Sequence, residues 1–400
     1  MANSLLTIDM ITRKSLEILE NNLVISRNCN RQYDDSFAVQ GAKIGSTLRI
    51  RLPDRALVTD GAALQVQDDN EQYTTLSVAS QKHIGINFTS AELTMQLDDF
   101  AERVLKPRIS QLASSIDADV ATAYKSIYNS VGTPGTTPGT SLVLLQAQQK
   151  LNEFATPMSP RYATVNPAAN AGLVEGMKGL FNPTDTVSRQ FKNGMMGTGV
   201  LGFDEINMSQ SIGMHTTGAW GTTITSTGTL STQGQATLPI SFTGSSKTWK
   251  QGDVFTIGGV YAVNPQTRQS TGSLQQFVVT ADLTASSTGT LSISPAIYTA
   301  DHALATVDSF PQATAVVTML GSASTQYAQN LSYHKDAITL ATADLLLPQG
   351  VDMASRQTHN GISMRIVRQY DINNDRMPCR VDVLYGYAAI RPSMATRIWG

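Results

Sequence analysis

The chain has 400 residues, which is long enough for about two or three domains with cores of their own. Charged residues make up only 15% of it, against about 25% in typical soluble domains, and with a net charge of −2 we expect no strong overall field that attracts a polyanion such as nucleic acid. Cys29 and Cys379 are too far apart in sequence to indicate a disulfide framework, and no run of about 18 apolar residues predicts a membrane-spanning helix.

Residues 1–43 are expected to form an N-terminal arm. Within residues 1–22 the apolar positions are interrupted by charged residues such as Asp9, Arg13 and Glu17, which is typical of an amphipathic helix and not of a secretory signal peptide. Two interpretations stay open. The segment is either an ordinary first helix packed on its own core or an extended arm that lies against a neighbouring molecule.

Residues 44–88 are predicted to form an extended β loop. Residues 47–52 alternate strictly, with Leu48, Ile50 and Leu52 on one face and arginines on the other, and residues 83–88 alternate again. The arginines either face solvent or meet acidic groups of an adjacent subunit. The candidates for contacts between subunits in this loop are Arg49, Arg51, Arg55, Asp68, Asp69 and Glu71.

A long helical stretch follows. Thr89 and Glu92 have the spacing of a capping box, and apolar residues then recur at helical intervals up to residue 104. Pro107 interrupts the hydrogen-bond ladder and begins a second helix, which the spacing extends to Ser130. At 1.5 Å per residue this second helix would be about 35 Å long. It suits either the central strut of a globular protein or a strut through a flat subunit that packs edge to edge with copies of itself.

Residues 133–140 form a proline-rich and glycine-rich linker that lacks the sequence of a phosphate-binding loop. Helix and strand patterns then alternate up to residue 209, which predicts a compact α/β segment. The composition changes at about Thr216. Between residues 216 and 324 there is no glutamate, and short β-rich runs separated by turn signals predict an inserted all-β barrel or sandwich.

No pattern in the chain indicates a catalytic, cofactor or metal site. The five histidines lack ligand spacing to one another or to a cysteine, and neighbouring aspartates on a helix, such as Asp117 and Asp119, do not face each other. Trp249, beside Lys250, is expected to anchor an edge of the β module. We therefore expect no enzyme activity, no cofactor and no metal.

The C-terminal part resumes the mixed pattern and ends in a hairpin, and here a family resemblance is found. Three stretches, in this order and spacing, resemble tailed-bacteriophage major capsid proteins. They are residues 193–204 (NGMMGTGVLGFD), residues 252–264 (GDVFTIGGVYAVN), which look like the insertion barrel of podovirus coat proteins, and residues 372–386 (INNDRMPCRVDVLYG) with residues 389–392 (AIRP).

The resemblance implies an α+β, Hong-Kong-97-type capsid fold with an inserted all-β barrel. Its parts would be an N-terminal arm (1–43), an extended β loop (44–88), a peripheral domain with the spine helix (89–135 and 355–400), an axial α/β domain (136–215 and 325–354) and the inserted barrel (216–324). It implies a subunit that assembles with itself as pentamers and hexamers into an icosahedral shell around double-stranded DNA, without sequence-specific binding.

The resemblance also implies scaffolding and portal proteins as partners, no membrane, assembly in the host cytoplasm and a final place in the virion. Two other functions remain open at this point. The Ser- and Thr-rich β module would fit a cell-surface or adhesion protein, although no signal peptide, anchor or disulfide supports that. An enzyme with an unrecognised site is the third alternative.

Overall fold

The computed structural model describes residues 8–31, 47–53, 55–58, 61, 62, 64, 66, 72–89, 106–176, 197–374 and 376–399. The helix expected after the capping box and the acidic run with Asp68, Asp69 and Glu71 lie outside these residues. The chain divides into two compact units. One comprises residues 1–50, 75–121 and 339–388, and the other comprises residues 51–74, 122–338 and 389–400.

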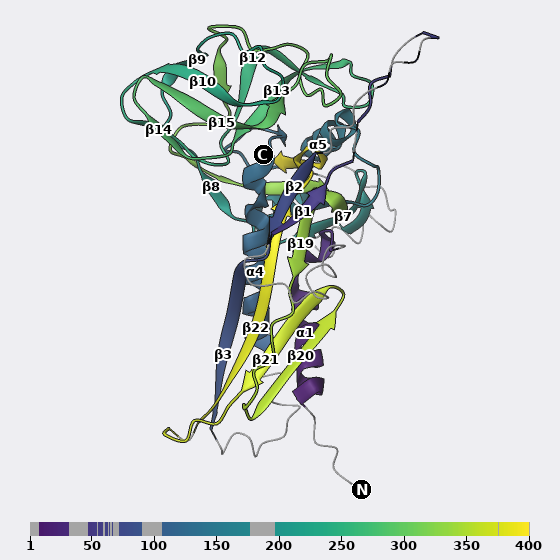
Figure 1. Ribbon diagram of the computed structural model, residues 1–400, viewed down its shortest axis with the longest axis vertical. Coiled ribbons are helices and arrows are strands. Elements are labelled where there is room, and N and C mark those ends of the chain that lie inside the picture. The colour runs from purple at the N-terminus through teal and green to yellow at the C-terminus, as the bar shows by residue number, and fades with distance from the viewer. Residues whose placement is uncertain are drawn as a thin grey trace. The chain divides into compact units, whose positions relative to one another are not determined.

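A five-stranded sheet organises the first unit (Figure 1). Its strands run in the order β19-β22-β21-β20, with β3 also paired to β22, and two helices, α1 and α4, pack against it. The elements are α1 (Ile8–Asn22), β3 (Ser80–Thr89), α4 (Lys106–Ala121), β19 (Ile338–Thr342), β20 (Met353–His359), β21 (Ile362–Arg368) and β22 (Arg376–Ala389). The longest ladder joins β22 to β3 in antiparallel register, unbroken from Arg376 opposite Thr89 to Tyr385 opposite Ser80.

Helix α4 is shorter than the sequence predicts. The apolar face is confirmed, because Ile109, Leu112, Ile116 and Val120 are all buried. The predicted end at Ser130 is wrong: the α-helix stops at Ala121, a 3-10 helix η4 (Thr122–Ser126) follows, and Ser130 begins the short strand β4 (Ser130–Val131). Strand β4 pairs in parallel with β23 (Ala395–Ile398), and this pairing with a distant part of the chain replaces the last helical turns.

Strands β1 (Thr47–Arg51) and β2 (Tyr73–Ser77) form a two-stranded sheet at the base of the extended loop. The predicted alternation is confirmed in β1, since Ile50 is buried while Arg49 and Arg51 are exposed. Beyond the strands, the Leu52 amide still donates a hydrogen bond of 2.8 Å to the Gln72 carbonyl. The boundary between the two units falls within these strands.

The second unit contains a six-stranded α/β sheet and a barrel. The sheet runs β4-β23-β18-β5-β7-β6, and its helices α5 (Ser141–Glu153) and α6 (Pro167–Gly176) contribute Leu144, Leu151 and Leu173 to a core shared with Val165 and Ile398. The remaining strands are β5 (Arg161–Val165), β6 (Gly197–Val200), β7 (Phe203–Met208) and β18 (Asn330–His334). The predicted α/β segment is thus present, and the last described residues of the chain complete its sheet.

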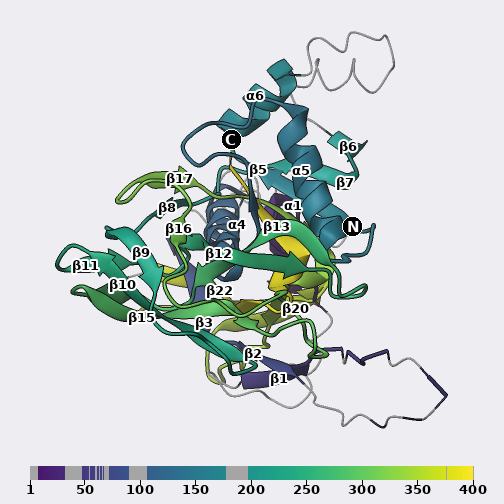
Figure 2. The same cartoon turned by 90° about the horizontal axis from the view of Figure 1, so that it is seen from above.

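The inserted segment forms an all-β barrel with strand order β16-β12-β13-β15-β10-β9 (Figure 2). Its strands are β9 (Thr222–Ser226), β10 (Gln235–Thr243), β12 (Val254–Val263), β13 (Ser270–Val279), β15 (Thr288–Ile297) and β16 (Val317–Met319). The sheet closes on itself because Thr225 bridges Val316 and the Ser226 amide donates to the Ala315 carbonyl at 2.9 Å. The sequence left a barrel and a sandwich as alternatives, and this closure identifies the segment as a barrel.

The expectation that Trp249 anchors an edge of the barrel is wrong. Trp249 lies on the short strand β11 (Lys247–Trp249) and is completely buried in the barrel core. Its ring packs edge-on against Phe242, with 4.7 Å between the ring centroids. The sequence did not reveal this burial, because Trp249 is flanked by polar residues and a three-residue strand is too short to show a periodic pattern.

Candidate subunit-contact surfaces

The three candidate arginines lie at the base of the extended loop. Arg49 and Arg51 point to the exposed face of β1, opposite the buried Ile50, and Arg55 follows beyond Pro53 and is also exposed. The three candidate carboxylates, Asp68, Asp69 and Glu71, lie outside the described residues. All three candidate arginines are therefore exposed near the base of the loop.

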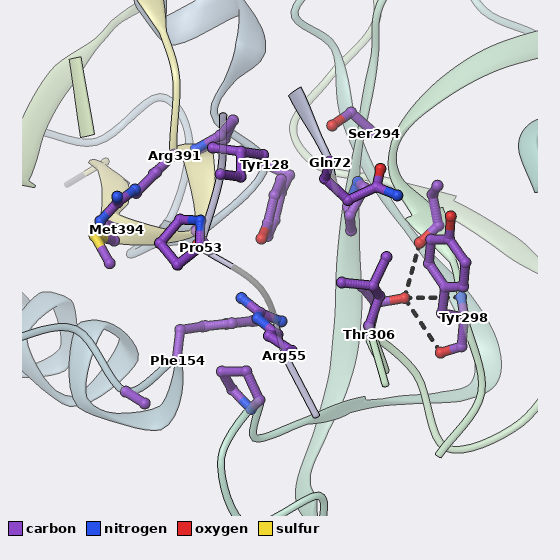
Figure 3. A pocket seen from close by; sticks show the side chains of 18 of the residues that line it. Pro53, Arg55, Gln72, Tyr128, Phe154, Ser294, Tyr298, Thr306, Arg391 and Met394 are labelled. Carbon is purple, nitrogen blue, oxygen red and sulfur yellow. Dashed lines mark hydrogen bonds between the residues drawn. The ribbon is translucent and has the colours of Figure 1, made fainter. Parts of the chain in front are cut away.

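A cavity of about 520 Å³ opens beside this loop base, with all of its walls in the second unit. Figure 3 shows Arg55, Tyr128 and Arg391 on one side and Tyr298 and Thr306 on the other. The walls carry two positive charges, Arg55 and Arg391, and contain no lysine, aspartate or glutamate. Within the part of the chain that the structure describes, neither guanidinium pairs with a carboxylate.

The walls of this cavity are fixed by local hydrogen bonds. The Asn129 side chain donates to the carbonyls of Ser393 and Ala395, and the Thr306 hydroxyl donates to the Ala296 carbonyl at 2.8 Å. Four lining residues are prolines, whose φ angles are locked: Pro53, Pro265, Pro295 and Pro392. The cavity is therefore a preformed feature of the second unit.

Burial raises the pKa of the Tyr128 phenol to about 12, so that it remains a neutral hydrogen-bond donor at physiological pH. Arg55 opposes this shift, because its positive charge favours the phenolate. The cavity thus presents two cationic groups, several neutral polar groups and an apolar surface that includes Phe154 and four prolines. Such a lining favours an occupant that carries both carboxylates and apolar side chains.

Sequence reasoning missed a run of exposed apolar residues in the extended loop. Val58, Leu64 and Val66 are 90%, 89% and 84% exposed. An isolated exposed apolar side chain is ordinary, but three within nine residues of one loop make this loop a candidate interaction surface. Composition could have revealed it, since residues 56–66 contain few charges between the arginines and the acidic run.

The second unit also holds a buried polar cluster that sequence spacing did not indicate. His215 Nε2 lies 2.9 Å from Asp253 Oδ1, and its Nδ1 lies 3.2 Å from the Tyr124 hydroxyl. The other oxygen of Asp253 accepts hydrogen bonds from the amides of Gly218 and Lys250. His215, Asp253 and Tyr124 are all buried, so the cluster ties strand β8 (Met214–Thr216) and the residue that precedes β12 to η4.

The described residues also bear on metal binding and on membrane crossing. Across the described ranges, no group of three or more His, Cys, Asp or Glu residues converges to hold a metal ion. Among the helices in those same ranges, none has both the length and the apolar character needed to cross a membrane.

This chain is similar to a curated phage protein and to chains in several solved structures. A curated major capsid protein of Acyrthosiphon pisum secondary endosymbiont phage 1 is 22% identical over 338 residues, which cover 79% of each chain. Among solved structures, a chain of Mycobacterium phage Che8 aligns with a TM-score of 0.47 at 11% identity, covering 94% of this chain and 90% of that one. The mature capsid of bacteriophage PhiM1 gives a TM-score of 0.40 at 12% identity, with 90% and 83% covered.

The family model for the P22 coat protein, gene protein 5, matches residues 1–400. The chain therefore belongs to the P22 coat protein family. This confirms the resemblance, the α+β Hong-Kong-97-type capsid fold with an inserted barrel, and the role of a structural major capsid protein of the virion. The adhesion alternative finds no support among these relatives.

Proposed function

We propose that this subunit assembles with copies of itself into pentamers and hexamers of an icosahedral shell that encloses packaged double-stranded DNA. The observation that carries the proposal is the match of the coat protein family to the whole chain. The net charge of −2 fits a shell that contains DNA without gripping it, because a phosphate-binding surface requires clustered lysine and arginine.

We assign the contacts between subunits to the N-terminal arm and to the extended loop, with Arg49, Arg51 and Arg55 meeting acidic groups of a neighbour. Asp68, Asp69 and Glu71 are the acidic candidates on the same loop. Each contact can be weak on its own, since a subunit in a closed shell touches several neighbours at once and the contacts reinforce one another.

The proposal extends to partners that act during assembly. Scaffolding and portal proteins would guide shell formation in the host cytoplasm, and the finished shell would hold the genome. No catalytic step is assigned to the chain. The five-part division into arm, extended loop, peripheral domain, axial domain and insertion is proposed as the way in which these roles are distributed.

The test is a double substitution, Arg49→Ala with Arg51→Ala, in the full-length chain. We expect the subunit to stay folded by circular dichroism, since both side chains are exposed, while the yield of closed particles in electron micrographs falls at least tenfold. Lys247→Ala with Lys250→Ala removes the same charge from the inserted barrel and serves as the matched control. Normal particle yield from the arginine variant would refute the charge-pair contact.

A further inference from the structure

The cavity beside the loop base has an electrostatic imbalance that the subunit itself leaves uncompensated in the described residues. Arg55 and Arg391 both line it, no acidic side chain does, and neither arginine is paired with a described carboxylate. Two like charges on one cavity wall repel each other, and each guanidinium can donate two parallel hydrogen bonds to a carboxylate. The cavity is therefore built for an occupant with at least one, and preferably two, carboxylates.

The lining also calls for an apolar component. Phe154, Tyr298 and the proline walls offer rigid apolar surface, and the volume of about 520 Å³ lies within the range of ordinary ligand sites. A free inorganic anion would leave this surface in contact with water. A peptide segment with apolar and acidic side chains side by side would satisfy both halves of the lining.

One segment of this same chain has that composition. Leu64 and Val66 are followed, after Gln67, by the acidic run Asp68-Asp69-Asn70-Glu71. Leu64 and Val66 are 89% and 84% exposed, so the apolar half of the segment does not fill the cavity of its own subunit. A shell supplies many copies of the chain at high local concentration, and a second copy is the partner that is always present.

We propose that the cavity receives residues 64–71 of a second copy of this chain, with its carboxylates paired to Arg55 and Arg391. The assignment rests on the proposed function, because it gives a receiving site to a loop that is proposed to contact neighbours. It makes the contact directional: the loop of one subunit enters the cavity of the next, and each subunit both gives and receives one loop.

The first experiment measures binding of a fluorescein-labelled peptide with the sequence of residues 62–73 to the unassembled full-length subunit. Fluorescence anisotropy should show binding that weakens at least tenfold for the peptide carrying Asp68→Asn, Asp69→Asn and Glu71→Gln. Binding should weaken similarly for the Arg55→Ala, Arg391→Ala subunit. The Arg55→Lys, Arg391→Lys subunit keeps the charge and should bind within a few-fold of wild type, which controls for misfolding.

Three results would overturn the proposal. The first is equal binding of the acidic and amidated peptides. The second is no binding of the acidic peptide to any subunit. The third is binding only when the chain's own residues carry Asp68→Asn, Asp69→Asn and Glu71→Gln, because the subunit's own acidic run would then fill the cavity.

The second experiment separates contacts within one chain from contacts between chains. Subunits carrying Asp69→Cys are mixed with subunits carrying Gln266→Cys, a residue on the cavity wall, and oxidised after assembly. Cross-linked dimers on a non-reducing gel support the proposal, and Thr229→Cys, at an exposed site elsewhere on the barrel, is the matched control that should give none. If Arg49 and Arg51 prove necessary for assembly but peptide binding and cross-linking both fail, the proposed function stands and this receiving site is wrong.

Discussion

Two buried carboxylates in the first unit show how the identity of the partner decides a pKa. Burial raises the pKa of Asp117, and its partners are neutral donors: the Val24 amide at 2.6 Å, the Ser26 amide at 3.0 Å and the Ser26 hydroxyl at 2.5 Å. Burial also acts to raise the pKa of Asp382, but hydrogen bonds from Arg365 and Arg380 outweigh it and hold that pKa below its usual value. The cationic partners make the difference.

At the residue scale, Asp117→Ala should destabilise the chain. The substitution leaves the three donors from residues 24 and 26 without an acceptor, and unsatisfied buried donors cost about 1–3 kcal/mol each. We expect the free energy of unfolding, measured by urea titration, to fall by about 3 kcal/mol. Asp117→Asn retains one acceptor oxygen and should lose less. A loss below that of Asp117→Asn would contradict the assignment of this side chain as a cap for residues 24–26.

Asp382 predicts a dependence of stability on pH. Arg365 Nη2 lies 2.7 Å from one carboxylate oxygen and Arg380 Nε lies 2.6 Å from the other. Because the folded-state pKa is lowered, the carboxylate contributes stability above its unfolded-state pKa of about 3.9, and this contribution is lost as the pH falls through the lower folded-state value.

Asp382→Asn should therefore be less stable than wild type by about 2 kcal/mol at pH 7, with the difference constant down to about pH 4 and shrinking below it. Urea titrations of both proteins between pH 2 and pH 7 measure it. Arg356→Ala removes a half-exposed arginine on the same sheet, and its difference in the free energy of unfolding from wild type should not shrink comparably at low pH. If the difference between wild type and Asp382→Asn grew as the pH fell, the Asp382 carboxylate would be destabilised by its surroundings.

At the scale of single elements, strand β11 depends on one ring. It is three residues long and pairs only with β14 (Leu283–Ala285) among the described strands, so Trp249 supplies most of its packing through the barrel core. Trp249→Ala should lower the free energy of unfolding by about 3–5 kcal/mol. Trp249→Phe should cost much less, because the indole N–H is buried without an acceptor in the described structure.

The half-buried Trp220 provides the control for this prediction, since Trp220→Ala opens a smaller cavity. Urea titrations followed by circular dichroism compare the three variants. Equal losses at positions 220 and 249 would mean that the barrel tolerates a void at Trp249 and that the ring is not central to its core.

The sequence predicts elements best where the pattern is local. The alternation around Ile50 is a period of two that a single strand carries by itself, and the buried stripe of α4 is likewise readable from its spacing. The end of α4 was not readable, since Ser130 joins a sheet through β23, near the other end of the chain. Local periodicity has no access to such a pairing.

The same limit applies to the contact surfaces. Exposure of Arg49 and Arg51 follows from their alternation with Ile50, and the structure confirms it. The cavity could not be predicted, because its walls come from residues near positions 53, 128, 265, 295 and 391, which only the fold brings together. A cavity lined by two arginines and no acid is a property of tertiary structure, although each residue in it is unremarkable in the sequence.

At the scale of the whole molecule, contacts that rely on exposed arginines should depend on salt. The Debye length falls from about 10 Å at 0.1 M to about 3 Å at 1 M ionic strength, so charge pairs at the loop base weaken while apolar contacts do not. We expect the initial assembly rate, followed by light scattering, to fall at least threefold over this range. The Arg49→Ala, Arg51→Ala variant should assemble more slowly but with a flatter salt dependence. If the assembly rates of both proteins fell equally steeply with ionic strength, the salt-sensitive contacts would not involve Arg49 and Arg51.

The ladder between β22 and β3 has a mechanical consequence. Its antiparallel pairs run without a break from Arg376 opposite Thr89 to Tyr385 opposite Ser80. A tensile force directed along these two strands loads all the hydrogen bonds between them at the same moment, so that these bonds must break together. A force that pulls the strand ends apart sideways breaks the hydrogen bonds one pair at a time. The subunit should therefore be stiff when stretched along this axis and comparatively easy to unzip across it.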